Sequence, residues 1–340
     1  MDYEPYQPAP SPDRPVRPAA IRIAAAVAVA LAFSWGVYAL LNAARPNGTI
    51  GFAFLLVLPA AVCAFVAYVG DPWKVRSQSW YLFVPLWILG AVIVLSLFVL
   101  REGTICVVLL APLWLGSGIV GTALTYRMRR RIQDGRTYCV TLFALPLVAI
   151  QLEPYVPLPT ATATVTRSIV VHATPARLWP LMRGVGDVRP GEGGWNLTQD
   201  VLGVPRPVGA RLVGGGIGAD RYAVWQHGVR FRERITRWHP ERALAWRFIF
   251  DDIAGWGYTD RHLMPDSDYF RVDGGGYTAT PIAPGLTRLT IHTTYRARTP
   301  VNLYARLWGE VFLGDLENNL LVLLKGRAER AGVEALPASR

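Results

Sequence analysis

Four long apolar stretches without a charged side chain dominate the first 130 residues of the chain. They run from Ile23 to Ala44, from Ile50 to Gly70, from Trp80 to Leu100 and from Thr104 to Tyr126. Each is close to the ~20 residues that an α-helix needs to cross the hydrocarbon core of a bilayer. Lipid offers no hydrogen-bond partner to the backbone, so such a stretch crosses as a helix. The sequence therefore predicts at least four membrane-spanning helices.

A fifth apolar stretch, from Tyr138 to Leu152, is shorter and contains Pro146. We interpret it as a fifth span; the alternative is a partial or interfacial segment. The predicted organisation is a disordered cytoplasmic tail at 1–20, a transmembrane helical domain at 21–153, a soluble domain at 160–330 and a tail at 331–340.

The loop charges predict how the helices are oriented. Cytoplasmic loops retain Lys and Arg, and only Arg45 and Arg101 lie on the side opposite the other ten basic residues. The amino terminus is therefore predicted to be cytoplasmic, and five crossings place the C-terminal domain outside the cytoplasm. With only four crossings that domain is cytoplasmic instead. The ten residues lie before the first span, between the second and third, and between the fourth and fifth: Arg14, Arg17, Arg22, Lys74, Arg76, Arg127, Arg129, Arg130, Arg131 and Arg136.

Composition narrows the possible functions. The chain is 52% hydrophobic and 17% charged, which is typical of a protein with a membrane part. Its net charge of +11 comes without a nucleic-acid motif, so we expect a basic surface that faces solvent or lipid headgroups, and no nucleic-acid partner. No ionisable group lies inside the five apolar stretches, which favours anchoring or assembly over transport. Histidine, cysteine and acidic residues lack the spacing of a metal site, and neither a metal nor another cofactor is predicted.

The remainder of the chain alternates apolar and polar residues with period two, which is typical of half-buried strands. A first strand at Val165–Ala173 precedes a helix that starts at Pro175 with Thr174 as its cap. Strands then follow one another without long helices between them, so the sheet is expected to be antiparallel. From Val301 to Arg330 the period becomes helical. The predicted apolar face of that helix consists of Tyr304, Leu307, Trp308, Val311, Phe312, Leu316, Leu320 and Leu323.

This succession resembles the START-like or SRPBCC superfamily, which includes polyketide cyclases and lipid-transfer domains. "SIVVHATPARLWPLM" resembles its first strand and helix, "FRERITRWHPERALAWRF" its central hairpin and "GLTRLTIHTTYRAR" its last strand. The resemblance implies an α+β helix-grip fold, in which a curved antiparallel sheet wraps around a long C-terminal helix. It also implies a hydrophobic cavity between sheet and helix. The five preceding spans depart from the soluble members of the superfamily.

Period-two alternation predicts which side chains face that cavity. Phe231, Glu233 and Ile235 share one face of their strand, and the arginines at 230, 232 and 234 share the other. An inward carboxylate is costly unless it is paired, so Glu233 is the most informative candidate. It either orients a ligand or transfers protons, or it pairs with a nearby arginine or reaches water at the mouth of the cavity. The full set of candidate ligand-binding residues is Phe231, Glu233, Trp246, Phe248, Tyr277, Tyr295, Tyr304 and Trp308.

We therefore expect a membrane-anchored module that binds a lipid or another hydrophobic small molecule, with membrane lipids and that ligand as its partners. One alternative is a cyclase-like or aromatase-like enzyme, although no catalytic constellation is visible. Another is a membrane sensor or assembly protein. The sequence does not indicate an oligomeric state.

Overall fold

The computed structural model describes residues 16–44, 51–96, 104–252, 255–256 and 264–333. The chain divides into two compact units. The first comprises Met1–Ile93 with Ala111–Glu153, and the second Val94–Leu110 with Pro154–Arg340. Most of the predicted tails, residues 1–15 and 334–340, lie outside the described part of the chain.

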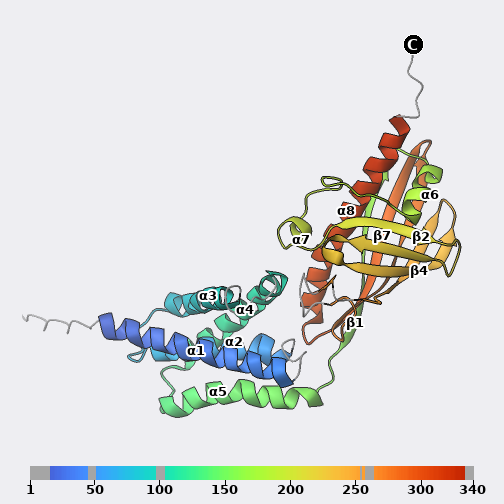
Figure 1. The fold of residues 1–340 in the computed structure, drawn as a ribbon. Helices are drawn as coiled ribbons and strands as arrows, with labels where there is room; N and C mark the ends of the chain where they lie inside the picture. The colour runs from blue at the N-terminus through green and yellow to red at the C-terminus, as the bar shows by residue number, and fades with distance from the viewer. Residues whose placement is uncertain (1–15, 45–50, 97–103, 253–254, 257–263, 334–340) are drawn as a thin grey trace, which may run out of the picture. The chain divides into compact units, whose positions relative to one another are not determined.

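The apolar stretches are helical, as predicted (Figure 1). Among the described residues, five helices are long and apolar enough to cross a membrane, and the fifth includes the stretch that contains Pro146. The first helix begins at Val16, so 16–20 belong to it and not to the predicted tail. Pro18 is tolerated there because a first-turn residue has no helical partner for its amide. The helices are α1 Val16–Ala44, α2 Leu58–Gly70 with the π-helical turn η2 Ala53–Val57 before it, α3 Gln78–Leu95, α4 Thr104–Met128 and α5 Gly135–Leu152.

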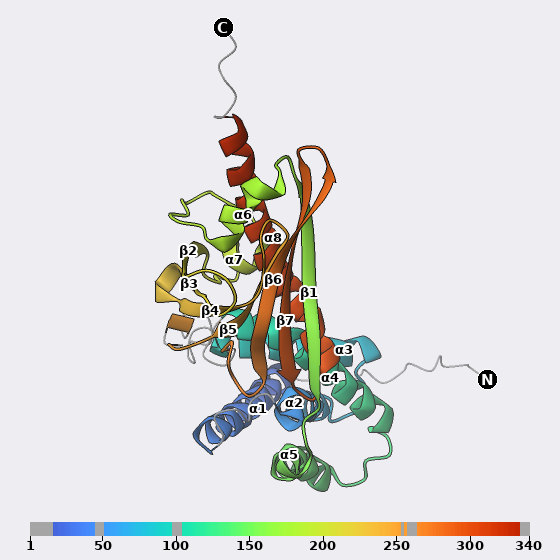
Figure 2. The ribbon, with the colours of Figure 1, turned by 90° about the vertical axis from the view of Figure 1, so that its right-hand side faces the viewer.

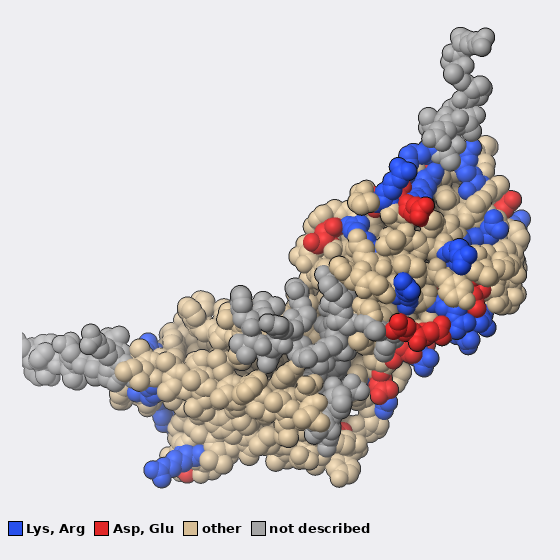
Figure 3. Space-filling model, viewed as in Figure 1, with Lys and Arg blue, Asp and Glu red and all other residues tan. Residues whose placement is uncertain are grey.

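Charged side chains of the first unit lie at helix ends, and the visible flank of the helices is almost uncharged (Figure 3). Asp71, just after α2, is buried and accepts hydrogen bonds from the Tyr81 hydroxyl and the Val75 amide, both at 2.9 Å. Arg129 lies 3.5 Å from the same carboxylate and stacks 4.1 Å from the centre of the Tyr126 ring. Asp71 and Arg129 thus pair their buried charges just beyond the ends of α2 and α4. The apolar segments between the helix ends contain no charged residue.

The second unit contains one antiparallel sheet of seven strands in the order β1-β7-β6-β5-β4-β3-β2. Each strand from β2 to β6 pairs with the next one in the chain, and β1 joins the sheet at its other edge by pairing with β7. The elements are β1 Thr160–Val171, α6 Pro175–Arg183, α7 Leu197–Asp200, β2 Pro207–Val213, β3 Asp220–Trp225, β4 Arg230–His239, β5 Ala243–Ile249, β6 Phe270–Ala283, β7 Leu286–Arg298 and α8 Asn302–Val333.

The first strand starts five residues earlier than the apolar alternation predicts. Residues 160–164 alternate threonine and alanine, and they pair with β7 from Thr160 opposite Arg298 to Thr164 opposite Thr294. Threonine is β-branched and favours extended backbone, so this segment continues the strand although its inner face consists only of the small, half-buried residues Ala161 and Ala163.

Helix α8 packs along the long strands β1 and β7 (Figure 2). The core between them includes Leu244, Leu289 and Leu321, each at most 1% exposed. Gly309 allows the closest approach, because a Cβ there would collide with the Tyr295 ring. The sheet and the helix confirm the predicted helix-grip architecture, in which the described part of the C-terminal half forms one layer of sheet and one layer of helices.

The predicted face of α8 is wrong in its first half. Leu307 is 62% exposed and Val311 38%, whereas Glu317 and Asn319 further along are 2% and 4% exposed. Apolar periodicity selects apolar side chains for the inner face, and it cannot detect polar side chains that the sheet covers.

Candidate functional site

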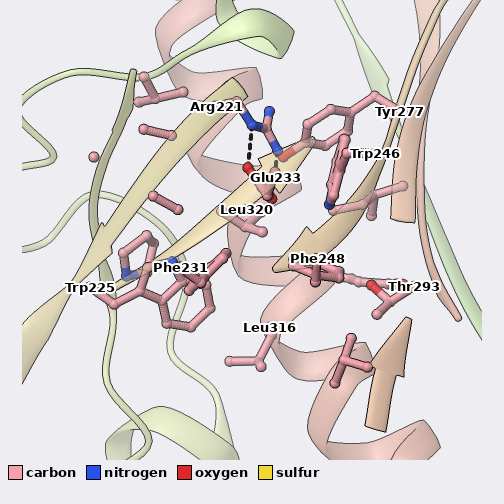
Figure 4. A pocket seen from close by; sticks show the side chains of 18 of the residues that line it. Arg221, Trp225, Phe231, Glu233, Trp246, Phe248, Tyr277, Thr293, Leu316 and Leu320 are labelled. Carbon is pink, nitrogen blue, oxygen red and sulfur yellow. Dashed lines mark hydrogen bonds and ion pairs between the residues drawn. The ribbon is translucent and has the colours of Figure 1, made fainter. Parts of the chain in front are cut away.

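A cavity of about 140 Å³ lies within the second unit, between the inner face of the sheet and α8 (Figure 4). Strands β3 to β7 supply one wall, and α8 supplies the other through residues such as Leu316 and Leu320. An apolar cavity of roughly 150 Å³ is large enough to hold benzene. The space therefore fits a molecule with one ring, or part of a larger one.

Aromatic rings form most of the sheet side of this cavity. Phe231 is their centre: its ring lies 5.6 Å from Phe248, 5.8 Å from Trp225 and 6.0 Å from Trp256, centre to centre. Phe250 stacks on Phe248 at 6.0 Å. They come together because inward positions of β3, β4 and β5 lie side by side in the sheet. The result is a rigid apolar surface with exposed ring faces.

A buried ion pair lies among these rings. Arg221 on β3 is directly opposite Glu233 on β4, and the guanidinium donates to both carboxylate oxygens, from Nε to Oε2 and from Nη2 to Oε1 at 2.9 Å. Its Nη1 donates to the Met182 carbonyl at 2.7 Å. The two side chains are only 6% and 5% exposed. Glu233 therefore pairs with a nearby arginine, which is one of the alternatives that its inward position predicts.

The surroundings adjust the protonation of this cluster. Burial alone lowers the pKa of Arg221, but the Glu233 carboxylate more than offsets it, so the guanidinium stays charged. It also lies 4.1 Å above the Trp246 ring. Burial raises the pKa of Tyr277 to about 12, so its hydroxyl stays protonated. This end of the cavity is polar but carries no net charge.

A second carboxyl group reaches the cavity from α8. Glu317 is 2% exposed, and among the described residues neither of its oxygens has a hydrogen-bond partner of ordinary geometry. Burial raises its pKa to about 8; the Thr293 hydroxyl on β7 and the more distant Arg167 lower it only in part. At neutral pH the side chain is therefore mainly a neutral acid that can donate a proton.

Five of the eight predicted residues line the cavity: Phe231, Glu233, Trp246, Phe248 and Tyr277. Tyr277 does so although the backbone register shifts between Val272 and Gly274 on the same strand.

The other three predicted residues do not line the cavity. Tyr295 is buried in a separate cluster with Val165 and Ala297. Tyr304 and Trp308 are half-buried on the first turns of α8, where the Trp308 ring stacks on Phe312 at 5.2 Å. They lie too far toward the start of the helix to reach the space that Leu316 and Leu320 border.

Sequence reasoning missed Arg221 and Glu317. Alternation on β3 places Arg221 on the same face as Ala223, but the neighbouring Tyr222 and Val224 are the larger apolar residues and suggest the opposite face. Both are in fact exposed, at 45% and 37%. Pairing β3 with β4 in an antiparallel register would have placed Arg221 beside Glu233. Glu317 gives a weaker signal, an acid between Leu316 and Leu320 on a helix.

No protein-family model matches the sequence, and no curated protein matches it significantly. Solved structures do match its C-terminal half. The Zhui aromatase/cyclase from Streptomyces sp. R1128 is 14% identical, with 51% of this chain and 96% of that chain covered and a TM-score of 0.33. A norcoclaurine synthase from Thalictrum flavum, in complex with dopamine and hydroxybenzaldehyde, is 14% identical. The match covers 53% of this chain and 91% of that chain with a TM-score of 0.31. Ara h 8.0201 is 10% identical, and the match covers 50% of this chain and 99% of that chain with a TM-score of 0.29.

The fold itself is defined by the strand order, the antiparallel register and the covering helix of this chain. The C-terminal half is a helix-grip fold, and the solved structures that it matches are members of the Bet v1/SRPBCC group.

Proposed function

We propose that the C-terminal half binds a hydrophobic small molecule in the cavity between the sheet and α8. The observation that supports this most directly is the wall of aromatic rings around an unfilled space of about 140 Å³. Burial of apolar ligand surface contributes about 25 cal/mol per Å², and a few polar groups then fix the orientation of the ligand. Arg221, Glu233, Tyr277 and Glu317 are the polar groups available for that purpose.

Filling the cavity tests this function. Ala223 is 5% exposed and lines the cavity, so Ala223→Phe should occupy the space and reduce the affinity for benzene or toluene at least tenfold. Val224 is its neighbour on β3 and faces the other side of the sheet, so Val224→Phe is the matched control and should leave binding unchanged. Binding can be followed with the full chain in lipid nanodiscs by ligand-observed NMR. Equal binding by both variants would place the ligand elsewhere.

We propose further that the five apolar helices anchor this module in a membrane, with the amino terminus in the cytoplasm and the C-terminal half outside it. The excess of Lys and Arg in alternate loops supports that orientation. A reporter fused after Arg340 that is active only outside the cytoplasm should be active, and one that needs the cytoplasm should be silent. The reverse pattern would mean that α5 does not complete a crossing.

One observation favours an enzymatic alternative. A carboxyl group whose pKa is about 8 can give up and recover a proton near neutral pH, and Glu317 presents such a group to the cavity. The paired Glu233 is less suited to that task because its carboxylate is held by Arg221. An enzyme of this kind would lose turnover in Glu317→Gln while it still bound its substrate. A pure binding module has no turnover to lose.

A further inference from the structure

The charges inside the cavity do not balance. Arg221 and Glu233 neutralise one another through two hydrogen bonds, and among the residues that the structure describes no basic side chain pairs with Glu317. The nearest cation that affects it, Arg167 on β1, is engaged by Glu310, with Nη1 and Oε2 3.2 Å apart. A carboxyl group that is 2% exposed and unpaired is expensive to keep in an apolar core. Such a group indicates a partner that arrives with the ligand.

The rings that line the cavity favour the same kind of partner. Phe231, Phe248 and Trp256 give the cavity an apolar wall that suits the hydrophobic body of a ligand, and aromatic rings tolerate a neighbouring cation better than a neighbouring anion. An anionic head group, such as the carboxylate of a fatty acid, meets the opposite conditions: Arg221 is already neutralised, and Glu317 would repel it. The charges and the aromatic lining of the cavity therefore favour a positively charged ligand over a negatively charged one.

We infer that the cavity selects a hydrophobic amine, whose ammonium group pairs with the Glu317 carboxylate while its apolar body, about the size of one ring, lies against the aromatic wall. This inference rests on the proposed function and names the ligand class for the same cavity. It involves only binding and one proton transfer: the Glu317 proton is released to solvent as the ammonium enters.

Proton release makes binding depend on pH in a defined direction. Burial holds the pKa of Glu317 at about 8 in the empty cavity, so the acid must ionise before it can pair with an ammonium. From pH 7 to pH 8 its ionised fraction rises from about one in eleven to one in two, and the affinity for an amine should rise about fivefold. A neutral ligand that accepts a hydrogen bond from the protonated acid shows the opposite trend. The other groups that face Glu317 are Glu310 on α8, Arg167 on β1, Thr293 on β7 and Tyr277 on β6.

Three probes with one phenyl ring test the inference: benzylamine and benzyl alcohol, which have the same shape, and the anion benzoate, each titrated into the full chain in nanodiscs. At pH 8 we expect benzylamine to bind at least tenfold more tightly than benzyl alcohol, and benzoate to bind least. Glu317→Gln removes the charge at constant shape, so it should weaken benzylamine at least tenfold and leave benzyl alcohol unchanged. Glu329→Gln is the control on the same helix, because Glu329 contacts Lys325 and the His172 amide away from the cavity.

The outcomes separate the two proposals. If benzyl alcohol binds but benzylamine binds no better, or if Glu317→Gln leaves benzylamine unaffected, the amine inference is wrong and the cavity still binds hydrophobic molecules. If none of the three probes binds, and Ala223→Phe changes nothing, the proposed function itself fails. Calorimetry in buffers of different ionisation enthalpy gives an independent check, because benzylamine binding should release close to one proton at pH 7 and benzyl alcohol none.

Discussion

Replacing Glu233 by leucine should lower the free energy of local unfolding of β3 and β4 by about 3 to 5 kcal/mol. The substitution leaves the Arg221 guanidinium buried at 6% exposure without its carboxylate, with the Met182 carbonyl and the Trp246 and Tyr277 side chains as uncharged partners. A buried charge that loses its counter-ion keeps its desolvation cost and loses the attraction that offset it. Native-state hydrogen exchange of the β3 and β4 amides, with the full chain in nanodiscs, measures the change.

Two controls show whether the charge is the cause. The double variant Arg221→Met with Glu233→Leu should regain most of the lost stability, because replacing a whole buried pair by apolar residues is often neutral or stabilising. Arg234→Leu changes the same strand on its other face, where Arg234 pairs with Asp220, and should have little effect. Additive losses in the double variant would mean that the two side chains do not depend on each other.

Raising the pH from about 5 to 8 should loosen the packing of α8 on the sheet through the ionisation of Glu317. The pKa of this group is 4.5 in an unfolded chain and about 8 in the fold. Between these values the folded state holds a proton that the unfolded state has released. The contribution of Glu317 to the free energy of unfolding is therefore fully present below pH 4.5. It is lost as the pH rises to 8, by at most about 1.4 kcal/mol per pH unit. Hydrogen exchange of α8 and β7 amides, corrected for intrinsic rates, measures this slope.

Glu317→Gln provides the reference, since it cannot ionise and should remove the loss of stability toward pH 8. The difference between the two proteins is needed because His292 acts in the opposite direction. Burial, together with the charge of Arg237, lowers the pKa of His292, so its contribution is lost as the pH falls. Identical pH profiles for the two proteins would show that Glu317 is already ionised in the fold at neutral pH.

The sequence predicted the second unit well where local rules dominate. The hairpin from Phe231 to Phe248 is an example, because period-two alternation and a turn after His239 place the apolar face inward up to the register shift between Ile235 and Arg237. The same alternation predicts that Glu233 faces inward, and its side chain is buried. The five apolar helices followed from length and the absence of charge alone.

The inner face of α8 was not predictable in the same way. A helix of 32 residues crosses several environments, and each turn is buried only if a strand lies opposite it. Tyr304 and Trp308 have the apolar character of core residues but lie outside the cavity, and Glu317 has the character of a surface residue but lies inside it. Helical periodicity locates a face, whereas burial depends on the partner.

By itself the sequence determined which segments are apolar helices, roughly where the strands run and which way the side chains of β4 and β5 point, because these properties depend on neighbours a few residues away. Only the tertiary structure decided that Arg221 neutralises Glu233 and that Glu317 lines the cavity with no counter-ion among the described residues. Both outcomes depend on contacts between residues 12 or more positions apart in the chain. Electrostatic energies change steeply with distance and burial, so the charge of the cavity, and with it the ligand that we infer, is set by how the sheet closes on the helix.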